Sequence, residues 1–143
     1  MNFPKTVFVD TSFFIALANS ADADHQQAIA FQSEISAQKI HKITSTYVLF
    51  ELGDGLSRLR FRSLAYRLIE VIHQDKTFQV VPPSTALFEQ ALDLFHRRQD
   101  KEWGLTDCSS FIIMQQMKLS AALTTDQHFE QAGFHALLRI NKA

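Results

Sequence analysis

Apolar residues in this chain occur either in short runs of strand length or in longer stripes of helical spacing. The first run, Val7 to Val9, is β-branched and aromatic, and Asp10 separates it from an apolar stretch of helical length. The same criteria predict further strands over 42–45, 78–81, 121–125 and 134–140. They predict further helices over 21–38, 46–59, 61–74, 84–99 and 106–117. Strands that alternate with helices favour an α/β fold, a parallel β-sheet flanked by helices.

Composition places the chain among compact globular proteins. It has 143 residues, of which 46% are hydrophobic, 4 are glycine and 3 are proline. We therefore expect one domain over residues 1–143. The single cysteine, Cys108, excludes an internal disulfide, and we expect it to lie in the core. The sequence has neither a signal-peptide pattern nor an apolar run of membrane-spanning length, which predicts a cytoplasmic protein without a membrane partner.

Three acidic residues border the most apolar segments of the chain. Asp10 and Asp126 follow predicted strands, and Asp107 opens a predicted helix. Ligands of open parallel sheets bind beyond the carboxyl ends of the strands, so these acids point to that edge. A fourth acid, Glu51, lies in a helix among apolar neighbours, a setting that risks drawing it towards the core. A buried carboxylate needs a cation or hydrogen-bond donors.

Each acid also has a simpler explanation. Aspartate is a preferred N-cap residue, so Asp10, Asp107 and Asp126 could each do no more than accept hydrogen bonds at a helix start. Glu51 could lie on a solvated flank of its helix. These explanations treat the positions separately, whereas a metal site accounts for them together. Mg²⁺ and Mn²⁺ bind carboxylate oxygens, and such ions can activate water and stabilise a leaving oxygen in phosphodiester hydrolysis.

Four segments resemble motifs of one known family, in the family's order and over nearly the whole chain. They are VDTSFFIALAN with Asp10, TYVLFELGDGLSR with Glu51, LTDCSSFIIMQQ with Asp107 and ALTTDQHFEQAGF with Asp126. With these motifs the chain resembles a PIN domain, and most closely a toxin ribonuclease of the VapC type.

The resemblance implies a three-layer α/β/α fold and an endoribonuclease that depends on Mg²⁺ or Mn²⁺ and cleaves RNA through a metal-activated water. It implies that Asp10, Glu51, Asp107 and Asp126 are the catalytic and metal-binding residues. Thr11 or Ser12 would support the site through a hydroxyl, and Thr106 would orient Asp107. The resemblance also implies a homodimer and a small protein antitoxin as partners.

Arginines follow the helix that carries Glu51 and are candidates for RNA contacts. Arg58, Arg60 and Arg62 could bind phosphates and position a strand for cleavage. The alternative is a solvated surface or ion pairs with neighbouring acids. The formal net charge of −1 does not itself attract nucleic acid. If the four acids were held in one metal site, however, 14 basic residues would face 11 remaining acidic ones.

Other functions fit the sequence less well. The six histidines lack the spacing of zinc hydrolases, and His128, two residues after Asp126, is expected at the surface. A phosphoryl-accepting signalling domain would share the size, the parallel sheet and an aspartate at a strand end. Such a domain needs an acid pair at the first strand and a lysine after the last, for which Lys142 comes too late. A non-catalytic RNA- or protein-binding module, in which the acids are only caps, remains the alternative.

Overall fold

The computed structural model describes residues 1–140, and at its centre lies a five-stranded sheet. The strands are β1 Thr6–Val9, β2 His41–Ser45, β3 Phe78–Val81, β4 Ala121–Leu123 and β5 His135–Ala136. Their order across the sheet is β3-β2-β1-β4-β5, and every neighbouring pair is parallel. The α/β fold with a parallel sheet is therefore confirmed. Residues 141–143, which include Lys142, lie outside the described part of the chain.

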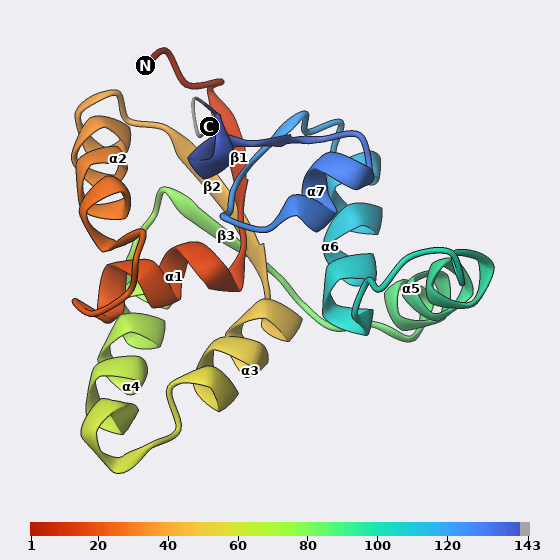
Figure 1. Ribbon diagram of the computed structural model, residues 1–143, viewed down its shortest axis with the longest axis horizontal. Helices are drawn as coiled ribbons and strands as arrows, with labels where there is room; N and C mark the ends of the chain where they lie inside the picture. The colour runs from red at the N-terminus through yellow and green to blue at the C-terminus, as the bar shows by residue number, and fades with distance from the viewer. Residues whose placement is uncertain (141–143) are drawn as a thin grey trace.

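Helices cover both faces of the sheet. They are α1 Thr11–Ala18, α2 His25–Ala37, α3 Thr46–Gly55, α4 Leu59–Gln74, α5 Thr85–Arg97, α6 Leu105–Gln116 and α7 Gln127–Gln131. Figure 1 shows α1, α2 and α4 on one side of the sheet and α5, α6 and α7 on the other, which is the predicted three-layer arrangement. Among the described residues, no helix is both long enough and apolar enough to cross a membrane.

Aromatic residues form the centre of the core between the sheet and α6. The ring of Phe129 lies 5.0 Å from that of Phe111 and 6.4 Å from that of Phe8, and all three side chains are fully buried. Trp103 packs against Phe111 at 5.0 Å, and Cys108 is buried, as the sequence analysis predicts for this cysteine. These contacts anchor α7 and the start of α6 to the sheet, and both segments carry candidate site residues.

The strand order creates a crevice at the carboxyl end of β1. The chain leaves β1 for β2 and β3 on one side and later returns to β4 on the other side. At such a reversal of strand order, the connections after the two neighbouring strands diverge and leave room for a ligand. The backbone N–H of Asp10 donates to the carbonyl of Leu123 at 3.1 Å, so the ends of β1 and β4 meet at this point.

Several predicted elements have different bounds in the structure, among them the helix predicted over 46–59, which ends at Gly55. The helix predicted over 21–38 begins only at His25, because the side chains of Asn19 and Asp22 each accept a hydrogen bond from the backbone N–H two residues ahead, which forms turns. The strand predicted over 134–140 ends at Ala136. From Leu137 to Arg139 the chain forms a 3₁₀ turn in place of a strand, and this turn buries Leu137 and Leu138 in the core.

We predict that Phe129→Ala lowers the free energy of unfolding by about 3–5 kcal/mol, because it leaves a cavity between Phe8 and Phe111. Phe50 is 72% exposed, so Phe50→Ala should change that free energy by less than about 0.5 kcal/mol. Urea denaturation of both variants and of wild type measures the difference. Equal losses in the two variants would show that the aromatic cluster does not anchor α7.

Candidate metal centre

Asp10 lies where β1 ends and α1 begins, and hydrogen bonds fix its carboxylate. It is the N-cap residue of α1, and only 4% of it is exposed. Its Oδ2 accepts hydrogen bonds from the Ser12 hydroxyl at 2.9 Å, the Thr124 hydroxyl at 2.8 Å and the Ser12 backbone N–H at 3.4 Å. The described residues donate no hydrogen bond to Oδ1, which leaves that oxygen available to a ligand.

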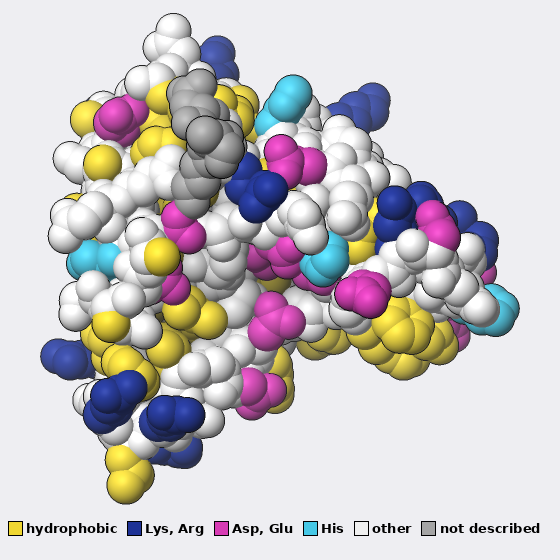
Figure 2. All heavy atoms as spheres, in the orientation of Figure 1, with side chains coloured by type: hydrophobic (Ala, Val, Ile, Leu, Met, Phe, Trp, Pro, Cys, Tyr) yellow, Lys and Arg dark blue, Asp and Glu magenta, His cyan; other side chains and the backbone are white. Residues whose placement is uncertain are grey.

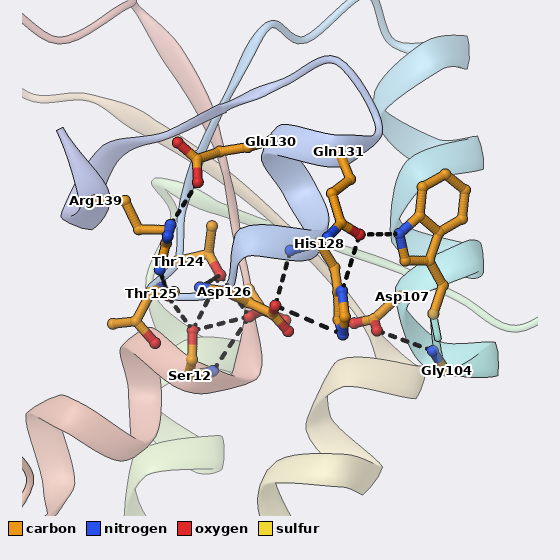
Figure 3. Close-up of polar contacts among 12 residues, drawn as sticks. Ser12, Gly104, Asp107, Thr124, Thr125, Asp126, His128, Glu130, Gln131 and Arg139 are labelled. Atoms are coloured by element: carbon orange, nitrogen blue, oxygen red, sulfur yellow. Dashed lines mark hydrogen bonds and ion pairs between the residues drawn. The ribbon is translucent and has the colours of Figure 1, made fainter. Parts of the chain in front are cut away.

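Thr124 connects Asp10 to the loop that carries Asp126. Besides donating to Asp10, its hydroxyl oxygen accepts from the backbone N–H of Asp126 at 3.0 Å. The backbone N–H of Thr125 donates to the Ser12 hydroxyl at 3.0 Å, as Figure 3 shows. The strand predicted over 121–125 therefore ends at Leu123, and the two threonines turn into the site. Sequence analysis missed Thr124, although a hydroxyl residue directly after an apolar strand and before an acid is a usable signal.

Asp107 and Asp126 lie at the starts of helices and serve there as caps. Asp126 is the N-cap of α7 and accepts from the backbone N–H of His128 at 2.9 Å. Asp107 is the third residue of α6, and its Oδ2 accepts from the backbone N–H of Gly104 at 3.0 Å. The capping explanation is therefore right for the hydrogen bonds of both residues. Capping is compatible with metal binding, because each carboxylate accepts the capping hydrogen bond with one oxygen and keeps further lone pairs for a cation.

One open cavity of about 490 Å³ brings the four predicted acids together. Its lining includes the acids of all four motifs and a fifth acid that the sequence analysis missed: Asp10, Glu51, Asp54, Asp107 and Asp126. Figure 2 shows acidic side chains grouped over this central part of the surface. Asp54 is three residues after Glu51 in α3, a spacing that places both on one helix face.

Of the two positions considered for Glu51, the solvated flank of its helix is confirmed and the position drawn towards the core is wrong. The residue is exposed, because Val48, Leu49 and Leu52 form the buried face of α3 and Glu51 lies beside that face. Its carboxylate reaches the cavity from the solvent side.

Burial and mutual repulsion raise the pKa of two of these acids. Burial, opposed by the hydrogen bonds from Thr124 and Ser12 and assisted by the charge of Glu51, raises the pKa of Asp10 from 3.8 to about 6. Burial also raises the pKa of Asp107 to about 7, to which the charges of Asp10, Asp126 and Glu51 add. In the part of the chain that the structure describes, no lysine or arginine forms an ion pair with any of the four acids.

The donor set suits a divalent cation. Within residues 1–140, one group of side chains has its potential ligand atoms within 4.8 Å of one another, and it consists of Asp107, Asp126 and His128. Asp10 adds a further carboxylate to the same cavity. Carboxylate oxygens are the ligands that Mg²⁺ and Mn²⁺ prefer, and a cation would relieve the repulsion that raises the two pKa values.

Of the residues predicted to support the site, all of which the structure describes, only Ser12 forms a hydrogen bond with one of the four acids, and the arginines lie outside the acidic cavity. Ser12 contacts Asp10, whereas the Thr11 hydroxyl donates to the Val48 carbonyl at 3.5 Å. No hydrogen bond joins Thr106 to Asp107 in the described residues, and Gly104 holds that carboxylate instead. The side chain of Arg62 lines a neighbouring hollow that shares Asp54 with the acidic cavity, while Arg58 and Arg60 line neither.

Comparisons with known proteins match nearly the whole chain. The sequence profile of the PIN domain matches residues 7–135. The 23S rRNA-specific endonuclease VapC20 of Mycobacterium tuberculosis is 30% identical over 131 residues, which cover 90% of this chain and 95% of that protein. The crystal structure of M. tuberculosis VapC20, described as a toxin that cleaves the sarcin-ricin loop, matches with a TM-score of 0.80 over 92% of this chain and 98% of that one. FitAcB from Neisseria gonorrhoeae, at 18% identity, has a TM-score of 0.62 over 90% of this chain and 94% of its own, a likeness of fold.

We predict that the metal-free protein loses stability as the pH rises from about 4 to about 7. In the unfolded chain Asp10 and Asp107 have their ordinary pKa of 3.8, but in the folded protein these values are about 6 and about 7. The folded state therefore binds more protons than the unfolded state in this window, and its free energy of unfolding falls as these protons are lost. Melting temperatures measured in EDTA across this range test the prediction.

Asp10→Asn should have a flatter pH profile and a higher melting temperature than wild type in EDTA at pH 7.5. The control is Asp93→Asn, which alters an exposed carboxylate on α5 and should follow the wild-type profile. Added Mn²⁺ should raise the melting temperature of wild type more than that of Asp10→Asn. A wild-type profile that rises over this pH range would contradict the repulsion between the acids.

Proposed function

Because the chain belongs to the PIN domain family, we propose that it is a metal-dependent endoribonuclease and the toxin of a toxin–antitoxin pair. The supporting observation is the cavity at the carboxyl edge of the sheet, where acids from four separate segments meet without a lysine or arginine partner among residues 1–140. A cluster of carboxylates that is not neutralised by the protein suits a bound cation, and that cation would in turn attract the phosphates of a nucleic acid.

We assign the metal to Asp10, Asp107 and Asp126, with Glu51 at the exposed rim of the cavity. Asp10 would present its Oδ1, because Ser12 and Thr124 hold its Oδ2. Gly104 and His128 in turn orient the carboxylates of Asp107 and Asp126 through backbone N–H groups. Mg²⁺ or Mn²⁺ bound there would lower the pKa of a water molecule and polarise the scissile phosphate. These fixed carboxylates supply a preorganised site rather than one that must form on binding.

Supporting residues act through the acids. We propose that Ser12 and Thr124 position Asp10, and that Thr11 contributes to the wall of the cavity rather than to its hydrogen bonds. Thr106 lines a separate pocket with Tyr47 and Phe88, so we assign it no contact with the acids. Burial of Asp10 also excludes water from one side of its carboxylate, which strengthens its interaction with a cation.

RNA is the proposed substrate, and ribosomal RNA is the first one to test. The relative VapC20 is named for its action on 23S rRNA, and its solved structure for cleavage of the sarcin-ricin loop. An RNA substrate of this kind would place the reaction in the cytoplasm. We propose that Arg58, Arg60 and Arg62 bind phosphates beyond the cavity, a role whose loss would reduce the salt dependence of RNA binding.

A toxin also requires partners. We propose that a small protein antitoxin keeps the nuclease inactive.

We also propose that the protein forms a homodimer through α5. Three apolar residues recur on this helix at spacings of four and three residues, and each is 44–47% exposed: Phe88, Leu92 and Phe95. Figure 2 shows the apolar surface along this helix at the lower right. An apolar stripe of this kind on a helix is typical of a packed surface, and a second copy would cover it.

We predict that purified protein cleaves a 23S rRNA fragment containing the sarcin-ricin loop in Mg²⁺ or Mn²⁺ and not in EDTA. Asp10→Asn and Asp107→Asn should each slow cleavage by more than about 100-fold, because each removes a carboxylate from the metal site. Cleavage rates are measured by gel electrophoresis of end-labelled RNA.

The matched control is Asp93→Asn, the same chemical change on the exposed face of α5, which should cleave at the wild-type rate. Expression in cells should arrest growth with Asp93→Asn and not with Asp10→Asn. If Asp10→Asn and Asp107→Asn cut RNA as fast as wild type, the acids are only helix caps and the site assignment is wrong. If wild type binds RNA but never cuts it, a non-catalytic binding module is the better description.

We also predict that Leu92→Arg converts a dimer into a monomer of 16.3 kDa, because a buried unpaired charge disrupts an apolar interface. Light scattering coupled to size-exclusion chromatography measures the mass. Ile29→Arg on α2, where Ile29 is 46% exposed, is the control and should leave the dimer intact. A wild-type protein that is monomeric at micromolar concentration would refute the proposed interface.

A further inference from the structure

We propose that His128 is a ligand of the metal ion in this site and gives it a preference for Mn²⁺ and related transition metals over Mg²⁺. The inference rests on the proposed function, since it concerns the metal of the same cavity. It goes further by adding a nitrogen ligand to a site that the four motifs describe as carboxylates alone.

The position of His128 is the first step of the argument. Its backbone N–H donates to Asp126 Oδ1 at 2.9 Å, which holds the start of α7 against this carboxylate. Its side-chain Nε2 lies 3.9 Å from the same Oδ1, and the ligand atoms of His128, Asp126 and Asp107 all lie within 4.8 Å of one another. In Figure 3 the imidazole extends from α7 towards Asp126 and Asp107. The sequence expectation of a surface role is therefore incomplete, because the side chain is only 23% exposed.

A chain of hydrogen bonds from Trp103 through Gln131 to His128 determines which imidazole nitrogen can bind a metal ion. The indole N–H of Trp103 donates to Gln131 Oε1 at 3.0 Å, and an indole nitrogen can only donate, so this atom of Gln131 is its oxygen. The same Oε1 lies 3.2 Å from His128 Nδ1. Because this oxygen is an acceptor, Nδ1 carries the hydrogen and donates it. In the neutral imidazole Nε2 then keeps its lone pair, and Nε2 is the nitrogen on the side of the acids.

This arrangement matches the usual support of a metal-binding histidine. Such a residue donates its other ring N–H to a carbonyl or carboxylate, which fixes the tautomer and the ring orientation. Here the carbonyl of Gln131 accepts, and Trp103, buried against Phe111, holds that carbonyl. An Nε2 atom without a hydrogen cannot donate to the carboxylates of Asp126 and Asp107. A cation bound between Nε2 and these carboxylates would account for their close approach.

The distance between His128 and Asp126, and the types of the ligand atoms, fit one ion. Two ligands that each lie about 2.0–2.2 Å from an ion are separated by at most about 4.4 Å, and the 3.9 Å between Nε2 and Asp126 Oδ1 falls within this limit. Imidazole nitrogen binds first-row transition metals well, whereas Mg²⁺ prefers oxygen and keeps its waters. A His128 ligand would therefore strengthen the binding of Mn²⁺ much more than that of Mg²⁺.

The competing role for His128 is an ion pair, in which a protonated imidazole neutralises Asp126 and binds no metal. The two roles differ in whether the metal and the imidazole nitrogen are bonded. Pulsed electron paramagnetic resonance detects this bond directly, because a nitrogen bound to Mn²⁺ produces a characteristic coupling.

The experiment uses the full chain loaded with one equivalent of Mn²⁺. Wild type should show the imidazole coupling, His128→Ala should lose it, and the control His135→Ala should keep it. His135 is exposed on β5, outside the cavity. Calorimetric titration should find Mn²⁺ binding weakened about 10- to 100-fold by His128→Ala and Mg²⁺ binding weakened less than about threefold. Trp103, the only tryptophan, gives a second readout, since its fluorescence should respond to Mn²⁺ through Gln131.

The outcomes separate this inference from the proposed function. Coupling in wild type and in His135→Ala supports His128 as the ligand, even if His128→Ala fails to fold. Mn²⁺ binding and RNA cleavage without a nitrogen coupling would overturn the inference and leave the nuclease intact. A protein that binds neither ion and cuts no RNA would overturn both.

Discussion

Carboxylates that are gathered at one edge of a sheet repel one another, and the whole site depends on how this repulsion is balanced. The described residues supply hydrogen-bond donors to Asp10 and Asp107 but no lysine or arginine partner. Burial and like charges accordingly raise the pKa of both acids. A metal-free site is therefore a source of instability at neutral pH, and a divalent cation is the simplest group that would remove it.

The fold explains why acids so distant in the sequence meet. Parallel strands β1 and β4 end side by side, so Asp10 and the loop of Asp126 share one edge. The aromatic cluster of Phe8, Phe111 and Phe129 then sets α6 and α7 so that their first turns face that edge. Helix starts are positions that favour aspartate in any case. The same residues can thus stabilise helices and bind a cation. Asp10 would use different oxygens for the two roles, whereas Asp126 Oδ1 can accept the capping hydrogen bond through one lone pair and bind a cation through another.

Local patterns predicted the parallel sheet and the placement of Asp10, Asp107 and Asp126, because strand ends and helix starts are visible in the sequence. Glu51 was assigned to the site through the family resemblance, and Asp54 was not predicted at all. Tertiary packing accounts for what the local patterns missed. The side chain of Glu51 is exposed because its neighbours, and not Glu51 itself, form the buried face of α3. Thr124 and His128 gain their importance only when β4 and α7 fold against Asp10 and Asp107. The last strand is short because the chain turns into a 3₁₀ helix at Leu137, a change that the apolar run over 134–140 does not reveal.

The most direct test of the account is the location of the metal in crystals grown with Mn²⁺, found by anomalous diffraction. The account predicts an anomalous peak within bonding distance of Asp10, Asp107 or Asp126 in the cavity between β1, α6 and α7. Two results would contradict the claim that these acids form one metal centre. One is the absence of such a peak when the protein is saturated with Mn²⁺ in solution, and the other is a peak at another surface instead.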